Sequence, residues 1–259
     1  MADTGVVPVI DLNADLAEGD VLTGTDRVLL DLVTSASLAC GFHAGNRTVM
    51  REAAAACAAR GVVIGAHVSY RDRPGFGRRP VDVAPDQLAA DVVEQWSTLA
   101  DEAGSVGATV SYVKPHGALY NAMAVDGALA AVVVEALAPH CAVLVAPPAS
   151  AVLAPAGAAG VRVVTEGFVD RGYAADGRLL PRAVPGALVG DPSEVAGRAR
   201  SLAVAGGLVA DGGTWLTLEV ETLCLHGDHP DAGHHARSVR EALDRAGVTV
   251  APFAAPDRW

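Results

Sequence analysis

Short runs of β-branched residues alternate with alanine-rich stretches along the whole chain of 259 residues. The β-branched runs are predicted strands at Val6–Leu12, Ser37–Cys40, Val62–Ala66, Val110–Val113, Ala142–Val145, Val161–Thr165 and Thr222–Leu225. The stretches between them are predicted helices at Asp26–Val33, Thr48–Arg60, Pro85–Ala103, Gly127–Leu137, Ser150–Ala156, Pro192–Ala205 and Asp231–Ala246. Regular alternation of this kind is typical of a parallel sheet built from βαβ units.

The number of units narrows the architecture. Seven units, with an eighth strand predicted at Val248–Val250, are too many for a small sandwich and favour a closed or nearly closed β/α barrel. An open, doubly wound sheet is the alternative. We expect a single domain over residues 1–259, because one barrel routinely reaches this length and no linker is visible.

Charge and cysteine usage limit the partners and the compartment. A net charge of −11 disfavours binding to nucleic acid. The four cysteines are far apart, lie in apolar runs and form no C-x-x-C pair, which suits reduced thiols in the cytoplasm: Cys40, Cys57, Cys141 and Cys224. The N-terminus lacks a basic segment followed by an apolar stretch, so no signal peptide is expected.

One uncharged stretch, Cys141–Val161, is long enough to raise the question of a membrane helix. Prolines at 147, 148 and 155 interrupt it, so we interpret it as a strand, a turn and a short helix. We therefore expect no membrane partner.

Lys114 is the only lysine among 19 basic residues. A compact ammonium with an adjustable pKa cannot be replaced by a planar guanidinium, although either suits a solvated surface. The residues before Lys114 form a predicted buried strand, which makes a surface role less fitting than a chemical one.

Ionisable and amide side chains follow almost every predicted strand, whereas the strand interiors contain few of them. These side chains come after the first four predicted strands and after the sixth and seventh. In chain order they are Asp11, Asn13, Asp15, Glu18, His43, Asn46, His67, Lys114, His116, Glu166, His226 and Asp228. The carboxyl ends of parallel strands are where α/β folds gather reactive groups. Helix capping is an equal alternative for Asn13, Asn46 or Asp228 taken singly, but not for the whole set.

Several known motifs are absent from the sequence, including the P-loop, G-x-G-x-x-G, H-E-x-x-H and G-x-S-x-G. The histidines at 226, 229, 234 and 235 resemble a metal-binding tract. However, Pro230 and Asp231 are typical of a helix start, so we expect His234 and His235 to be solvated on the first turns of that helix and keep His226 as the functional one.

The remaining groups suit hydrolysis of an acyl bond. Asp15 or His67 is a candidate base that deprotonates water. Lys114, with His43 or His116, is a candidate to stabilise the developing oxyanion. A divalent metal that generates hydroxide is equally compatible with this set. The sequence does not choose between these alternatives.

Seven segments resemble, in order, the LamB/YcsF family, whose members are the A subunits of prokaryotic 5-oxoprolinase. They are IDLNADLAEGD, LVTSASLACGFHAGN, VVIGAHVSYRD, GFGRR, VKPHGALYN, EGFVDRGYAADGRLLPR and LCLHGDHP, and they extend over nearly the whole chain. The resemblance implies a distorted seven- or eight-stranded β/α barrel of the glycoside hydrolase/deacetylase type. It also implies ATP-dependent opening of the lactam ring of 5-oxo-L-proline to L-glutamate, together with separate B and C subunits.

The resemblance also assigns residues by matching motifs. The matched positions are Asp11, Asn13 and Asp15 in the DLN-x-D block, His43 in GFHAG, His67 in GAH, Lys114 and His116 in KPHGALYN, the post-strand Glu166, and His226 and Asp228 in HGD. Three departures stand out. Ala14 replaces a frequent cysteine, Ala17 replaces a usual glycine, and Val68-Ser69 replaces a common Pro-Gly pair.

Our mechanistic hypothesis places Lys114 and His116 on the substrate or phosphate oxygen, while Asp15 and His67 activate water. Arg78 and Arg79 are candidates to bind a carboxylate or phosphate, and two solvated loop arginines are an equal alternative. Two other functions stay open: a stand-alone metal-dependent deacetylase or amidohydrolase, and a non-catalytic subunit that only binds substrate.

Overall fold

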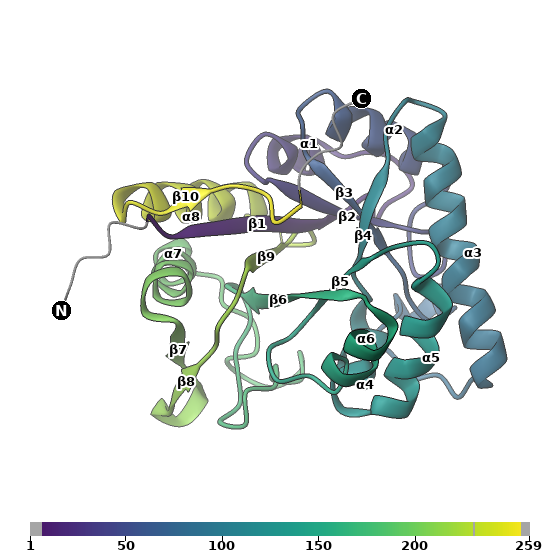
Figure 1. The fold of residues 1–259 in the computed structure, drawn as a ribbon. Helices are drawn as coiled ribbons and strands as arrows, with labels where there is room; N and C mark the ends of the chain where they lie inside the picture. The colour runs from purple at the N-terminus through teal and green to yellow at the C-terminus, as the bar shows by residue number, and fades with distance from the viewer. Residues whose placement is uncertain (1–6, 230, 255–259) are drawn as a thin grey trace.

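Seven parallel strands close into a barrel in the computed structural model, which describes residues 7–229 and 231–254. The strands follow the order β1-β2-β3-β4-β5-β6-β9, and β9 pairs with β1 to complete the ring (Figure 1). Their bounds are β1 Val9–Leu16, β2 Ser35–Ala39, β3 Val63–His67, β4 Val110–Val113, β5 Val143–Ala146, β6 Arg162–Phe168 and β9 Thr222–His226. The barrel predicted from the alternating pattern is therefore confirmed.

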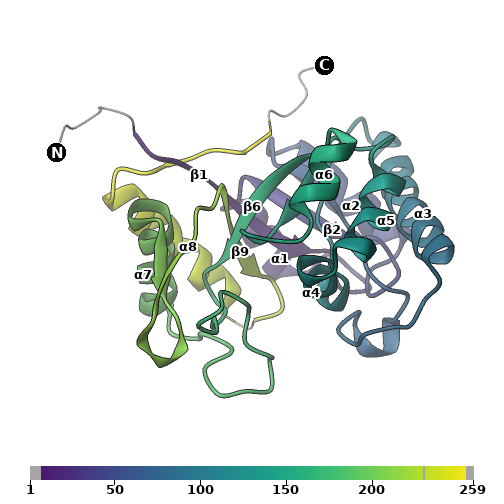
Figure 2. The same ribbon diagram turned by 60° about the horizontal axis from the view of Figure 1, so that its bottom comes forward.

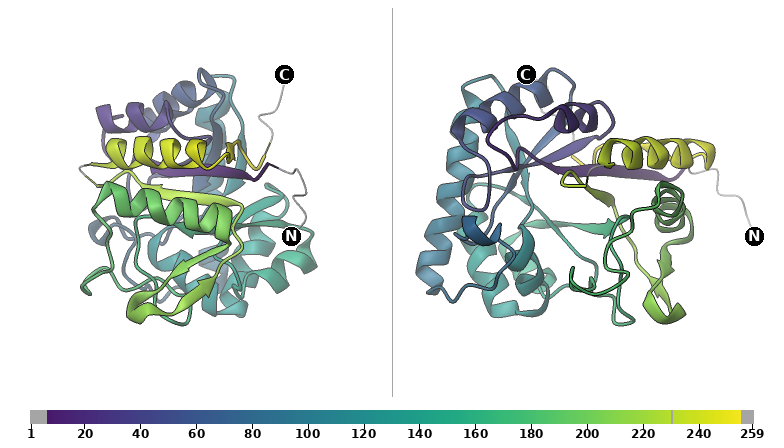
Figure 3. Two further views of the ribbon diagram at one scale, coloured as in Figure 1. Left: turned by 90° about the vertical axis from the view of Figure 1, so that its left-hand side faces the viewer. Right: turned by 180° about the vertical axis from the view of Figure 1, so that it is seen from behind.

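Helices cover the outside of the barrel. They are α1 Gly24–Leu30, α2 Arg47–Ala58, α3 Pro85–Gly104, α4 Gly117–Val125, α5 Gly127–Leu137, α6 Leu153–Ala159, α7 Pro192–Arg200 and α8 Ala232–Arg245. Helices α2, α3, α5 and α6 follow one another around one side, and α7 packs against α8 on the other (Figures 1 and 3). Several begin at side-chain caps, such as Asn46 on α2 and Asp126 on α5.

Strand alternation explains why polar groups gather inside the ring. In β1 the even positions from Ile10 to Leu16 are aliphatic and join the large core beneath the helices. The odd positions Asp11, Asn13 and Asp15 lie on the opposite face, toward the barrel interior. The period of two along a single strand therefore separates the packing residues from the chemistry.

Element boundaries differ from the predictions in a few places. Strand β1 continues to Leu16, so its acidic residues lie within the strand and not after it, and Val6 lies outside the described residues. The predicted eighth strand is β10 (Thr249–Val250), which pairs with the start of β1 outside the ring. Helix α4 and a small hairpin, β7 (Gly207–Val209) with β8 (Trp215–Thr217), were not predicted.

The prediction that His235 is solvated is wrong, whereas His234 is exposed as expected. His235 is 1% exposed, and its Nε2 lies 3.0 Å from the carbonyl oxygen of Gly190. The helix beginning near Asp231 turns this side toward the loop before α7, which sequence periodicity alone did not reveal. Pro230 lies outside the described residues.

A long loop joins β6 to α7 and projects below the barrel in Figure 2. Two isolated antiparallel bridges fold it on itself, Arg171 with Leu188 and Tyr173 with Leu179. Among residues 7–229 and 231–254, no single helix is long and apolar enough to cross a membrane. Only α4 and α5 taken together meet that test, and they are bent by 116° relative to each other.

Candidate active site

A cavity of about 1110 Å³ opens at the carboxyl ends of the barrel strands. Its floor includes Asp15, His67, Lys114, His116 and His226, each from the end of a strand or from the residues just after it. Helix α4 and the long loop after β6 form much of its wall, and the lining carries four arginines: Arg78, Arg171, Arg178 and Arg182. The structure thus brings six of the twelve predicted site residues to the lining of one hollow: Asp15, His67, Arg78, Lys114, His116 and His226.

Lys114 lies at the centre of a buried polar cage and is 1% exposed. Its Nζ lies 2.8 Å from both Asp15 Oδ1 and Glu166 Oε1. It also donates to Asn13 Oδ1 and Cys224 Sγ, each at 3.1 Å. These acceptors occupy all three ammonium protons, so Lys114 holds the carboxylates in place and has no proton left over for a substrate oxygen.

The charges within this cage stabilise one another. Burial alone would raise the pKa of Asp15, but the neighbouring His67 and Lys114 hold it well below its usual range. Burial would lower the pKa of Lys114, but Asp15, Cys224 and Glu166 hold it well above its usual range. Asp15 is therefore an ionised carboxylate at neutral pH, and it lies at the cavity floor.

Three histidines and one glutamate form a second cluster beside the cage. His43 and His116 stack with ring centroids 3.9 Å apart, and His67 meets both rings edge-on. Glu18 Oε1 lies 3.3 Å from His43 Nε2, 3.5 Å from His116 Nδ1 and 3.9 Å from His67 Nε2. His116 Nδ1 and His67 Nε2 are 2.9 Å apart. We refer to Glu18, His43, His67 and His116 as the histidine cluster.

The outer nitrogen of each ring has a partner that fixes its tautomer. His67 Nδ1 lies 2.9 Å from the carbonyl oxygen of Lys114, and His116 Nε2 lies 2.8 Å from that of Phe76. A carbonyl oxygen only accepts, so both nitrogens carry hydrogen. His43 Nδ1 lies 3.0 Å from Ser69 Oγ, whose own hydrogen goes to the Tyr70 carbonyl oxygen.

Burial governs protonation within the histidine cluster. It lowers the pKa of His43 and His116 well below the ordinary value, and neighbouring imidazoles add to this effect. Burial would also lower the pKa of His67, but the Asp15 carboxylate outweighs it and raises that pKa. Burial raises the pKa of Glu18. His43 and His116 are thus neutral imidazoles, and they lie with His67 around the Glu18 carboxyl group.

Ser69 and Ala17 occupy two positions where the sequence departs from the family pattern. Ser69 Oγ supports His43 through the hydrogen bond described above. Ala17 has a φ of 60°, a backbone conformation that favours glycine, and this turn carries the chain from Asp15 to Glu18.

Asp170 is a site residue that the sequence reasoning missed. It is 6% exposed, and both carboxylate oxygens lie 3.0 Å from His226 Nδ1. It also accepts a hydrogen bond from the backbone N–H of His226. The sequence contains a signal for it, because Asp170 is an aspartate two residues beyond the end of β6. Glu18 was noted at a strand end but not placed with the histidines.

The cavity mouth carries an ion-pair bridge between distant segments. Asp228 Oδ2 lies 2.6 Å from Arg78 Nη2 and 3.4 Å from Arg182 Nη1. All three side chains are about one-third exposed. Asp228 therefore holds two guanidinium groups together at the entrance.

Six predicted site residues do not line the cavity: Asn13, His43 and Asp228, which are described above, and Asp11, Arg79 and Glu166. Asp11 is deep in the barrel, where it accepts hydrogen bonds from the hydroxyl groups of Thr34, Ser35 and Thr222. Burial raises its pKa to about 6, although those hydrogen bonds oppose the shift. Within the described residues, the cavity lining includes Arg78 but not Arg79, whose guanidinium binds Asp72. Glu166 is fully buried and contacts Lys114 and Asn13 of the buried polar cage.

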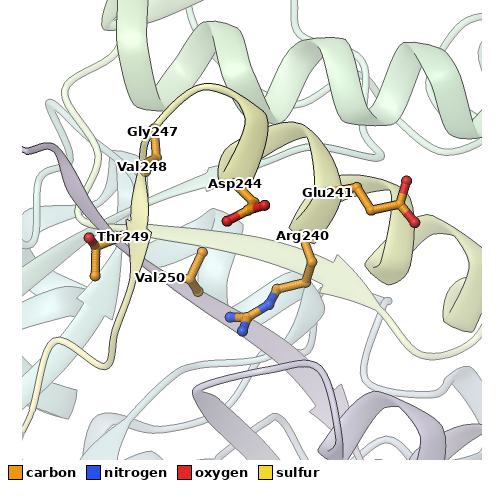
Figure 4. Close-up of a pocket in the computed structure, with 7 residues that line it drawn as sticks. All are labelled: Arg240, Glu241, Asp244, Gly247, Val248, Thr249 and Val250. Atoms are coloured by element: carbon orange, nitrogen blue, oxygen red, sulfur yellow. The ribbon is translucent and has the colours of Figure 1, made fainter.

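A separate pocket of about 570 Å³ lies where α8 turns into β10, with Arg240, Asp244 and Thr249 among its lining residues (Figure 4). Strand β10 pairs with the first residues of β1, so this pocket lies toward the opposite end of the barrel from the cavity. None of the candidate site residues lines it.

The fold and the site together define a closed parallel β/α barrel with ionisable groups collected at the carboxyl ends of its strands. A polysaccharide deacetylase, Bc1974 from Bacillus cereus, shares this fold with a TM-score of 0.53 at 13% identity, covering 97% of this chain and 95% of that one. At this identity the likeness concerns the fold alone.

The chain belongs to the LamB/YcsF family, whose model matches residues 10–258. It is 46% identical over 250 residues to a protein from Symbiobacterium thermophilum that is named as the A subunit of 5-oxoprolinase, covering 95% of this chain and 96% of that protein. The crystal structure of a lactam utilization protein from Thermus thermophilus superposes with a TM-score of 0.87 at 40% identity, covering 94% of this chain and 99% of that one. The family predicted from the seven segments is confirmed.

Proposed function

We propose that this chain acts as the A subunit of a 5-oxoprolinase and carries the ring-opening site for 5-oxo-L-proline. Its relatives bear that name, and one solved structure bears the name lactam utilization protein. The observation that carries the proposal is the cavity itself, which joins an ionised carboxylate at its floor to guanidinium groups along its wall.

The arginine wall suits an anionic substrate. 5-Oxoproline carries a carboxylate, and a phosphorylated form carries more negative charge. Arg78 and Arg182 already bind one carboxylate, that of Asp228, so they present the donors that such groups need. Arg79 is not part of this proposal, because it binds Asp72.

The chemistry explains a requirement for ATP. A five-membered lactam is a stable amide, and phosphoryl transfer from ATP to its oxygen would give an O-phosphorylated imidate. Addition of one water to the ring carbon and cleavage of the C–N bond free the amine and leave an acyl phosphate. A second water then releases phosphate and gives L-glutamate, with ADP as the other product.

In this proposal Asp15 orients the attacking water and receives its proton. Lys114 acts as a positioning residue, because its ammonium group is surrounded by acceptors on Asn13, Asp15, Cys224 and Glu166. This revises our sequence hypothesis that Lys114 contacts the substrate oxygen, and the Nε2 hydrogen of His116 is likewise donated to the Phe76 carbonyl oxygen. Separate B and C subunits complete the enzyme.

The test is reconstitution of the chain with its presumed B and C subunits, following ADP and glutamate together. Asp15→Asn keeps the shape of the side chain but removes its charge, and we expect ring opening to fall by at least about 100-fold. Asp20→Asn is the matched control, because the Asp20 side chain is 87% exposed, and it should leave the rate unchanged.

Each alternative gives a different result. Hydrolysis by the isolated chain without ATP would favour a stand-alone amide hydrolase. Binding of 5-oxoproline together with normal turnover in Asp15→Asn would favour a non-catalytic role in which the chain only binds substrate. Either result would overturn the proposed function or the role of Asp15 within it.

A further inference from the structure

We propose that the histidine cluster, Glu18, His43, His67 and His116, binds one divalent transition-metal ion. The ligand atoms of the four residues all lie within 4.8 Å of one another. The three histidines are at most 6% exposed. The inference concerns ion binding only, and it stands whether or not the chain acts on 5-oxoproline.

The spacing of the four atoms matches a metal coordination shell. Zinc bonds of about 2.0–2.1 Å set at the tetrahedral angle place neighbouring ligand atoms about 3.3 Å apart. Glu18 Oε1 lies 3.3, 3.5 and 3.9 Å from the three ring nitrogens. His67 Nε2 and His116 Nδ1 lie 2.9 Å apart. Small movements of these side chains would complete the shell.

The ring orientations supply lone pairs to the same point. His67 and His116 donate their outer N–H groups to backbone carbonyl oxygens, so their inner nitrogens are acceptors. His43 donates to Ser69 Oγ, so its Nε2 is also an acceptor. Metal-binding histidines usually have such a partner on the other nitrogen, because it fixes the tautomer and the ring direction.

Two of these atoms lack hydrogen bonds in the described structure. His43 Nε2 and Glu18 Oε1 are buried and have no hydrogen-bond partner among the described residues. His67 Nε2 faces His116 Nδ1 as one acceptor facing another unless an additional proton lies between them. Buried polar groups without partners are costly, and a single cation would satisfy all four atoms.

The donor types select the ion. Imidazole nitrogens suit zinc and its first-row neighbours, whereas magnesium and calcium prefer oxygen ligands. His67 and His116 also line the cavity, so the ion would lie at its floor. Asp15 Oδ2 is 3.4 Å from His67 Nε2, which places the ion beside the carboxylate of the proposed site.

The test uses the purified full-length chain, freed of metal with a chelator and then titrated with Zn²⁺ by calorimetry. We expect one ion per chain, confirmed by elemental analysis after dialysis. Replacement with Co²⁺ should give the intense visible absorption of a four-coordinate ion. Glu18→Gln and His43→Gln should each weaken Zn²⁺ binding by at least about 10-fold.

Ser69→Ala is a gentler variant that keeps all four ligands and removes only the partner of His43 Nδ1. It should weaken binding by about 10- to 100-fold and remain decisive if His43→Gln does not fold. The control is His229→Gln with His234→Gln, which removes two histidines outside the cluster and should change nothing. Absence of stoichiometric Zn²⁺ in the wild type, or equal affinity in all variants, would overturn the proposal.

Discussion

The single lysine of the chain contributes as an organiser of other side chains. Lys114 sits between Asp15 and Glu166, with a carboxylate oxygen of each at 2.8 Å. A buried charge with good partners is costly to disturb, because removing it leaves its partners uncompensated.

We expect Lys114→Met to lower the free energy of unfolding by about 3–5 kcal/mol, because it leaves two buried carboxylates unpaired. Lys114→Arg keeps the charge but brings a larger planar group, so ring opening in the reconstituted complex should fall by about 100-fold through displacement of Asp15. Urea denaturation and turnover assays measure the two effects. Near-normal turnover in Lys114→Arg would show that Lys114 does not position Asp15 for the reaction. Arg245→Lys, at an exposed side chain, is the control.

Asp170 gives a prediction about pH. Burial would raise its pKa, but the adjacent His226 and its hydrogen bonds lower it from 3.8 to about 2. A lowered carboxyl pKa contributes stability above the unfolded value of 3.8, and this contribution is lost as the pH falls toward 2. Asp170→Asn should therefore cost about 2 kcal/mol at pH 5 and progressively less between about pH 4 and pH 2.

Denaturation curves of wild type and Asp170→Asn across this pH range check the sign. A difference in unfolding free energy that stays constant, or grows as the pH falls, would show that the carboxylate is not stabilised in this way. Exposed Asp176→Asn serves as the control.

Sequence reasoning identified the residue types of the site better than their roles. The strand-end rule correctly placed Asp15, His67 and Lys114 near one another, because the carboxyl ends of parallel strands share one rim. It could not show that Lys114 has no free proton, since Cys224 and Glu166 are distant from it along the chain. Nor could it place Asp11 deeper in the barrel, because β1 continues to Leu16, beyond its predicted end at Leu12.

At the scale of elements, the loop around the 3-10 turn at Arg73–Gly75 and the start of α4 meet at two glycines. Gly117 has a φ of 53°, and a Cβ there would lie 2.5 Å from the carbonyl oxygen of Gly77. The same loop supplies the Phe76 carbonyl oxygen that accepts from His116. This close approach sets where the loop lies relative to the histidine cluster.

Gly117→Ala should therefore destabilise the protein more than an alanine at another left-handed glycine. Gly107 has a φ of 73°, and a methyl group there would have no heavy atom within 4 Å, so Gly107→Ala should cost only about 1–2 kcal/mol for the backbone. Gly117→Ala adds overpacking of about 1–3 kcal/mol. Urea denaturation measures both variants, and equal unfolding free energies would contradict the close contact.

Elements with strong periodicity were predictable and those without it were not. The strands, α2, α3 and α5 agree with prediction to within a few residues, because each has an apolar face or a clear start signal. Helix α4 begins at a glycine shortly after the end of β4, and it has no side-chain cap. Tertiary contacts with the loop at Gly77 define it, and single-sequence patterns do not record those contacts.

At the scale of the whole molecule, barrel closure depends on residues from both ends of the chain. Strand β1 pairs with β2 on one side and β9 on the other, and residues 11–15 of β1 match residues 222–226 of β9. The ring is thus completed only when the last strand meets the first.

Closure of this kind predicts cooperative unfolding, in agreement with the expected single domain. Far-ultraviolet circular dichroism and tryptophan fluorescence should give coincident transitions in urea. Two of the three tryptophans lie in different regions of the fold, Trp96 in α3 and Trp215 in β8, and Trp259 lies outside the described residues. Two separated transitions would show that part of the chain folds independently.

The Asp228 bridge has a consequence for discrimination among ligands. Arg78 and Arg182 already bind the carboxylate of Asp228. A neutral ligand cannot replace that carboxylate, whereas an anionic ligand can replace it at little electrostatic cost. An anionic ligand that binds Arg78 and Arg182 must therefore compete with Asp228 for the same guanidinium groups. Binding of such a ligand to Arg78 and Arg182 would release the Asp228 carboxylate from both ion pairs.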